Sequence, residues 1–236
     1  MCDFFSAIVI PNEARKGGVE IFHNQYTDSH EELVSFFKLK DKGKLARIEF
    51  KPDSGVDLAD LKKYKFRIDE ARTPEWLDEE KQDFVKAYCA ETVGRMIVSG
   101  DVEILLGGVY IIAKGANIGF AKQSRIIAVL SGGTVQRVES GGTVQSVGSG
   151  GTVQSVESGG TVQIVGSGGT VQIVESGGTV QIAESGGTVQ RVESGGTVQS
   201  VWSGGTVQRV LSGGIVQSVE SGSKILEDFN EKPKQS

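Results

Sequence analysis

The chain has 236 residues, a formal net charge of −5 and a sequence pI near 5.2. This acidic balance argues against a nucleic-acid-binding surface, which needs a clustered basic face. The two cysteines, Cys2 and Cys89, are too few for a disulfide framework or a cysteine-rich metal site, so no metal or other cofactor is expected. No stretch approaches the roughly 18–20 apolar residues of a membrane span, and the first residues lack the pattern of a secretory signal. We therefore expect a cytoplasmic protein with neither a membrane nor a nucleic acid as partner.

Residues 1–72 have the pattern of a small α/β domain. The apolar, β-branched runs FFSAIVIP and GVEIFH predict two adjacent antiparallel strands. Ser29 and Glu32 have the spacing of a capping box, so a helix should follow Ser29. Alternating apolar residues in KLARIEF and YKFRI then predict two further strands.

A second helix is expected over residues 73–100. Thr73 has the character of an N-cap, Pro74 suits the first helical position, and Gly100 would end the helix after about Val98. Cys89 falls among the core positions of this helix. The predicted order is therefore strand, strand, helix, strand, strand, helix, with the last helix capping the C-terminal half of the chain.

The second half of the chain is an internal repeat. Residues 101–130 can be aligned with the repeat as imperfect units, and regular nonapeptides of the form SGGTVQxVx fill residues 131–222. Residues 223–236 read as a C-terminal cap with a charged tail. Within the ten units from Ser131 to Glu220 there is no Asp, Lys, His, Pro or Phe.

The nonapeptide predicts a β-solenoid, also called a β-helix. Its fifth residue is always Val and its eighth is Val except at Ala183, so these two positions should point inward while positions seven and nine face solvent. Two glycines and several β-branched residues per unit disfavour a helix, and the strict period disfavours disorder. Stacked coils instead place each residue on its own copy. The predicted fold is thus mainly β, a solenoid preceded by a small α/β domain.

The size of one coil is less well determined by the pattern. Eighteen residues per coil would stack Glu139, Glu157, Glu175 and Glu193, which is unfavourable for like charges. Twenty-seven residues per coil would separate most of them. Because the glutamates recur in alternate units, we favour eighteen.

Two resemblances add to this interpretation. The SGGTVQ unit is similar to the Gly-Gly-Thr repeats of self-associating autotransporter adhesins, a resemblance that implies a β-helix. The opening MCDFFS and the segment DSHEELVSFF at 28–37 look like the start of uncharacterised proteins encoded by bacteriophages and prophages. That second resemblance covers about 70 residues and implies an origin rather than an activity.

Catalytic candidates are few. If Met1 is removed, Cys2 would become an N-terminal thiol whose own amine could act as base, and His30 lies in the same domain with His23 and Asp28. The Met-Cys start also resembles class II glutamine amidotransferases. The alternative is a purely structural role, in which Cys2 is a small residue that begins a strand and His30 is a residue of the first helical turn. We favour the structural role for both residues.

Binding candidates lie on the outside of the solenoid. Trp202 and Leu211 are apolar residues at position nine of consecutive units, which suggests an interaction patch or contacts with the C-terminal tail. Rows of outward hydroxyls and amides could match a periodic ligand such as ice or a glycan. The candidate binding residues of these rows are Thr143, Gln145, Thr161 and Gln163.

The function expected from these features is non-enzymatic. The solenoid would act as a structural or binding scaffold with a protein partner or as a homo-oligomer, in a phage setting as an assembly accessory or as an inhibitor of a host component. One alternative is an N-terminal-cysteine hydrolase displayed on a solenoid. The other is an adhesin-like, ice-binding or glycan-binding face.

Overall fold

The computed structural model describes residues 5–25, 27–39, 44–53 and 57–230. The chain divides into two compact units, residues 1–96 and residues 97–236. Within the described residues no helix is long and apolar enough to cross a membrane.

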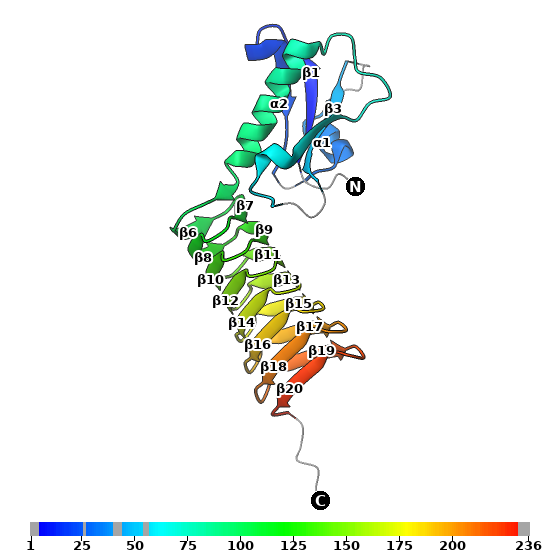
Figure 1. The fold of residues 1–236 in the computed structure, drawn as a ribbon. Coiled ribbons are helices and arrows are strands. Elements are labelled where there is room, and N and C mark those ends of the chain that lie inside the picture. The colour runs from blue at the N-terminus through cyan, green and yellow to red at the C-terminus, as the bar shows by residue number, and fades with distance from the viewer. Residues whose placement is uncertain (1–4, 26, 40–43, 54–56, 231–236) are drawn as a thin grey trace, which may run out of the picture. The chain divides into compact units, whose positions relative to one another are not determined.

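The first unit contains one antiparallel four-stranded sheet in the order β2-β1-β3-β4 (Figure 1). Its strands and helices follow the predicted order, and a short 3₁₀ turn precedes β2 and another precedes β4. The bounds are β1 Ser6–Pro11, η1 Lys16–Gly18, β2 Val19–Phe22, α1 His30–Phe36, β3 Ala46–Pro52, η2 Leu61–Lys63, β4 Tyr64–Ile68 and α2 Glu79–Gly94.

Both faces of this sheet are covered, which explains why β1 is an uninterrupted apolar run. Ala7 and Val9 belong to the core that includes α2, whereas Ile8 packs with Leu33 of α1 on the opposite face. Successive residues of a strand point to opposite faces, so a strand buried on both sides needs apolar residues throughout. The first unit is therefore a three-layer arrangement of helix, sheet and helix.

The second helix is shorter than predicted at its start. Thr73 and Pro74 do not begin α2; the backbone N–H of Leu77 bonds to the carbonyl of Pro74 in a turn, and Leu77 is buried. Asp78 is the N-cap instead, because its carboxylate accepts a backbone hydrogen bond of 2.9 Å from the first turn. Anchoring Leu77 in the core thus outweighs the local preference for a helix starting at Pro74.

The same helix also ends earlier than predicted. It stops at Gly94, and Ile97–Val98 forms the short strand β5, which pairs in parallel with β7, Val109–Ile112. Two apolar residues that would have extended the helix are therefore the first residues of the solenoid. Strand pairing with a later segment is a non-local effect that helix propensity does not include.

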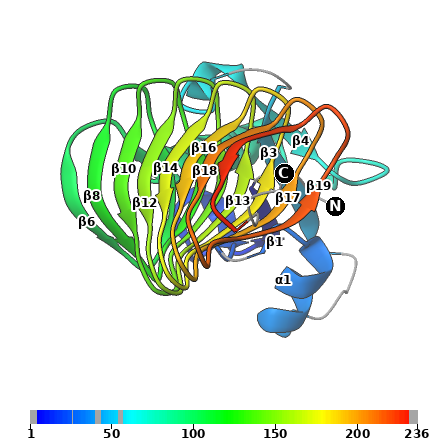
Figure 2. The same ribbon diagram turned by 90° about the horizontal axis from the view of Figure 1, so that it is seen from below.

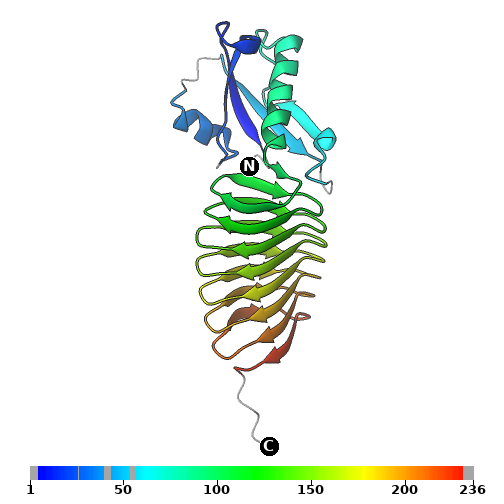
Figure 3. The same ribbon diagram turned by 90° about the vertical axis from the view of Figure 1, so that its left-hand side faces the viewer.

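The second unit is a β-solenoid made of two parallel eight-stranded sheets (Figures 1 and 3). Each sheet is named here by its last strand. Every second strand along the chain belongs to the β20 sheet, and each of its strands stacks on the one two places earlier. Its members are β6 Val102–Leu106, β8 Asn117–Lys122, β10 Thr134–Val138, β12 Thr152–Val156, β14 Thr170–Val174, β16 Thr188–Val192, β18 Thr206–Val210 and β20 Lys224–Asp228.

The β19 sheet faces the β20 sheet across the core, as the view along the solenoid shows (Figure 2). One strand of each sheet and two Gly-containing turns make one coil. The remaining members of the β19 sheet, after β5 and β7, are β9 Arg125–Val129, β11 Thr143–Val147, β13 Thr161–Val165, β15 Thr179–Ala183, β17 Thr197–Val201 and β19 Ile215–Val219.

The register confirms eighteen residues per coil and excludes twenty-seven. Thr134 pairs with Thr152 and Val135 with Val153, and the same offset recurs through the regular strands of both sheets. The solenoid has about seven coils. Each nonapeptide therefore forms one strand and one turn, and two nonapeptides close a coil.

The core of the solenoid is built from stacked columns of valines. At positions five and eight, every side chain from Val135 to Val207 is fully buried. Two columns come from each sheet, because both positions of every strand point inward. The prediction that these two positions form a common dry axis is confirmed.

Ala183 offers a test of how tightly this column is packed. It is fully buried between Val165 and Val201, where every other regular unit has Val at the same position. Ala183→Val should therefore fill the missing volume and raise the free energy of unfolding by about 1 kcal/mol, measured by urea denaturation. A loss of stability would show that the coil has closed around the smaller side chain.

Candidate functional site

The eighteen-residue coil sorts the charges of the repeat onto one side. The three arginines of the nonapeptides, Arg137, Arg191 and Arg209, all occupy position seven of strands in the β20 sheet. In the β19 sheet the same position holds Ser or Ile. One outer face is therefore charged, and the other is uncharged along its regular strands.

A column of four glutamates lines the turns that follow the β20-sheet strands. Glu139, Glu157, Glu175 and Glu193 stack in register, as expected for this coil size. Three cations and one hydroxyl offset the repulsion among these carboxylates. The ion pairs are Lys122–Glu139 at 3.9 Å, Arg137–Glu157 at 3.7 Å and Arg191–Glu193 at 3.1 Å. Glu175 has no cation in this set, but its Oε1 accepts a hydrogen bond of 2.7 Å from Ser155 Oγ.

The expectation that position seven faces solvent is wrong for one residue beside this column. Ser155 is buried, because its hydroxyl turns toward the carboxylate of Glu175 in the next coil. The pKa of Glu157 is raised, first by burial and then by the charge of Glu175, while the charge of Arg137 lowers it. The charged form of Glu157 therefore destabilises the folded state at neutral pH.

Neutralising Glu157 should stabilise the solenoid. An acid with a raised pKa in the folded state contributes stability below its unfolded pKa and loses it as pH rises through the folded value. Glu157→Gln should therefore raise the free energy of unfolding at pH 7 by about 0.5 kcal/mol, and this gain should vanish at acid pH. Thermal unfolding followed by circular dichroism at both pH values measures it. Glu184→Gln is the control, since its column neighbours are Gly166 and Trp202.

A shallow groove of about 560 Å³ lies on the charged outer face. It runs across β14, β16, β18 and β20, so it follows the solenoid axis. Its position-six residues are three amides followed by a leucine, and its position-seven residues are an isoleucine, two arginines and a glutamate. The lining residues are Gln172, Gln190, Gln208, Ile173, Arg191, Arg209, Leu226 and Glu227.

Charge in this groove is internally paired. Arg209 Nε lies 2.6 Å from Glu227 Oε2, and Arg191 pairs with Glu193 at its rim. Further along the same face, the guanidinium of Arg137 lies 3.8 Å above the ring of Phe120. The face thus presents both signs of charge together with amides, a mixture suited to a protein or polar polymer rather than to a single ion.

The predicted hydroxyl and amide rows lie on the other face. Thr143 pairs in register with Thr161 on adjacent strands of the β19 sheet, and Gln145 and Gln163 follow two residues later. All four side chains are partly exposed. The structure therefore brings these four residues together, but on the face opposite the groove.

Trp202 and Leu211 are not brought together. Trp202 follows β17 of the β19 sheet and is 41% exposed, whereas Leu211 follows β18 of the β20 sheet and is half-buried. An eighteen-residue coil places position nine of consecutive units at opposite turns. Leu211 does meet the C-terminal segment, because the side chain of Asn230 bonds to its carbonyl at 3.5 Å.

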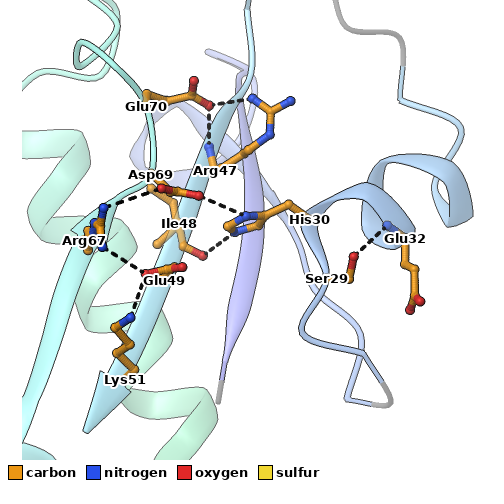
Figure 4. Close-up of polar contacts among 10 residues, drawn as sticks. All are labelled: Ser29, His30, Glu32, Arg47, Ile48, Glu49, Lys51, Arg67, Asp69 and Glu70. Carbon is orange, nitrogen blue, oxygen red and sulfur yellow. Dashed lines mark hydrogen bonds and ion pairs between the residues drawn. The ribbon is translucent and has the colours of Figure 1, made fainter. Parts of the chain in front are cut away.

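In the first unit, His30 is held in a structural network (Figure 4). It is the first residue of α1, is only 6% exposed, and its Nε2 lies 3.0 Å from the carbonyl oxygen of Ile48. Its Nδ1 lies 3.7 Å from Asp69 Oδ2. The ring therefore ties α1 to the sheet, and Ser29 caps the helix by accepting from the N–H of Glu32 at 3.4 Å.

Around His30 the network continues through charged pairs at the sheet surface. Arg47 donates to Glu70 at 2.9 Å, and Glu49 lies near Lys51 at 3.3 Å and Arg67 at 3.9 Å (Figure 4). Glu49 and Arg67 come from neighbouring strands, so their contact reinforces the pairing of β3 with β4.

The second histidine occupies an aromatic environment. Burial lowers the pKa of His23, whose Nδ1 lies 3.2 Å from the hydroxyl of Tyr88. In the same helix as Tyr88, burial raises the pKa of Cys89 to about 12, so its thiol is not a nucleophile at neutral pH. Cys89 is fully buried in the core, as predicted. Cys2, the catalytic candidate named together with His30, lies outside the described residues.

Comparisons with protein-family models, curated proteins and solved structures found no match. Among the residues described, no three His, Cys, Asp or Glu side chains gather as metal ligands. Among the described residues, the groove on the β20 sheet is the strongest candidate site, because a volume of about 560 Å³ is lined by amides and by charges of both signs. Its signal in the sequence was the restriction of arginine to alternate units, which becomes informative only once the coil size is known.

Proposed function

We propose that the protein is a non-enzymatic binding scaffold whose solenoid holds an extended segment of a protein partner along the β20 sheet. The groove across β14 to β20 carries this proposal. Its length follows the axis, so one partner segment would contact equivalent amides in successive coils. Arginine is enriched at protein interfaces because it combines charge, planar hydrogen bonding and an apolar stem.

The proposed setting is the cytoplasm of a bacterium infected by, or carrying, a phage. The resemblance of segment 28–37 to phage and prophage proteins supports this setting. A scaffold of this kind would serve as an assembly accessory or as a binder of a host component, and the partner would be a protein of one of these two origins.

Matched substitutions on the two faces test the proposal. The double variant Arg191→Ser and Arg209→Ser changes the groove, and Ser already occupies position seven in several other units. The control, Ile164→Ser and Ile182→Ser, introduces the same residue at the same position of the β19 sheet without removing a charge. Both variants are used to capture proteins from a bacterial lysate, with and without phage infection, alongside the unchanged chain.

The proposal predicts a captured protein that the groove variant loses and the control retains. If the control variant loses it instead, the uncharged face with Thr161 and Gln163 is the binding face. If both variants capture the same proteins as the unchanged chain, the groove is not a binding site.

A further inference from the structure

The exposed apolar side chains of the nonapeptide region gather at its C-terminal end. From residue 107 to residue 201, the structure describes no large apolar side chain that is exposed. Five are exposed within the last coils. They are Trp202, Ile215, Val219, Leu226 and Phe229.

Two of these residues break the repeat on its outer surface. Ile215 stands where every other regular unit has Thr, and Leu226 stands where the regular units have Gln. They are 46% and 62% exposed. Among the ten regular units and β20, apolar residues replace Thr at position four and Gln at position six in the last coil alone, although the repeat itself shows that polar residues fit there.

The core is also open at this end. Val219 occupies an inward position that is fully buried, or nearly so, in every preceding regular unit, yet it is 49% exposed. β19 and β20 are the terminal strands of their sheets in the described chain, so their outer edges present unpaired backbone groups. β19 carries no charged residue that would discourage pairing. The six residues that follow Asn230, EKPKQS, are polar or charged except for one proline.

We propose that two copies of the chain join end to end through this coil, with β19 of each copy pairing antiparallel with β20 of the other. A coil built of two strands and two turns runs its strands in opposite directions, so a two-fold axis parallel to the strands sets β19 against an antiparallel β20. Each coil rises by about 4.8 Å, and β20 therefore ends roughly half a spacing beyond β19. That step lets both pairs of edges meet at once.

The apolar residues of the two ends complement each other in this arrangement. Aligning the inward positions of β19 with those of β20 places Val219 opposite Ile225 of the second copy, which continues the valine core. The same register places Ile215 opposite Phe229 of the second copy. Each contact occurs twice, because a two-fold interface is isologous.

The charges at the end also match. Glu220 falls opposite Lys224 of the second copy, and Lys224 forms no ion pair with any residue that the structure describes. Asp228 falls beside Val216 of the second copy, which opposes tight association. The interface is therefore expected to be reversible, with the Glu220–Lys224 pairs setting its register.

Analytical ultracentrifugation of the full chain over a range of concentrations tests this inference. The mass should rise toward twice the 25.1 kDa of one chain as concentration increases. Ile215→Thr, which restores the repeat, and Lys224→Glu should each weaken association at least tenfold. The double variant Glu220→Lys with Lys224→Glu should restore it, because it exchanges the partners of the ion pair.

Glu184→Lys is the matched control, since Glu184 lies in the same column as Glu220 two coils earlier and should leave association unchanged. A single-chain mass at every concentration would overturn the inference, as would a dimer insensitive to both single variants. In a further test, the chain is truncated after Asn230. If only the truncated chain dimerises, the inference is overturned for the full chain, and residues 231–236 cover the end instead. None of these outcomes depends on the proposed partner groove.

Discussion

Val171→Asp is expected to disrupt the solenoid. Val171 is fully buried between Val153 and Val189 in the central column, and no cation lies among the described residues of that core to pair with a carboxylate. Burying an unpaired charge costs several kcal/mol, so we expect a loss of about 4 kcal/mol or more in the free energy of unfolding. Because each coil contacts only its neighbours, the break should also uncouple the coils on its two sides.

Circular dichroism during urea denaturation measures this effect. Thr170→Asp is the control, because Thr170 precedes Val171 on β14 and points outward. It should cost less than about 1 kcal/mol, as expected of a partly exposed substitution. Equal unfolding curves for Val171→Asp and the unchanged chain would contradict the buried axis.

Gly178→Ala is expected to be nearly as damaging, for a steric reason. A Cβ atom at Gly178 would lie 2.1 Å from the carbonyl oxygen of Val156 in the preceding coil. That oxygen belongs to the stacked backbone and cannot move without separating the coils. We expect a loss of about 3 kcal/mol, comparable with other backbone clashes in well-packed sites.

The turn also explains why two glycines are adjacent. Gly177 has a φ of +75°, a left-handed conformation that residues with a Cβ avoid, whereas Gly178 is needed only for the close approach. Gly166→Ala is the control, because Gly166 has neither a left-handed φ nor a close backbone approach. A Cβ atom there would lie 3.6 Å from its nearest neighbour, the carbonyl oxygen of Val147. Thermal unfolding should show a large fall for Gly178→Ala and little change for Gly166→Ala; similar melting temperatures would contradict the clash.

Much of the solenoid could be predicted because the same apolar positions recur in every nonapeptide. Two apolar residues at fixed positions of every nonapeptide are enough to define an inward column, and glutamates in alternate units favoured eighteen residues per coil. The same pattern could not show the conformation that each glycine adopts. That depends on the distance between stacked backbones, which the order of residues alone does not contain.

Site predictions were harder, because they depend on which residues meet across coils. Trp202 and Leu211 are nine residues apart and look like neighbours along the chain, but half a coil separates them. Arg191 and Arg209 are eighteen apart and look distant, yet they line one groove. Even an accurate prediction of strands would not have located that groove without the register.

The sequence by itself determined that the C-terminal half is a solenoid, which residues form its core, and that a small α/β unit precedes it. These features depend on local periodicity, which every nonapeptide repeats, and on the alternation of apolar residues in the first unit. Only the tertiary structure decided where α2 begins and ends, which outer face carries the charges, and that the last coil leaves Val219 uncovered. Each of these depends on contacts between segments far apart in the chain, where packing of a few side chains outweighs local preference.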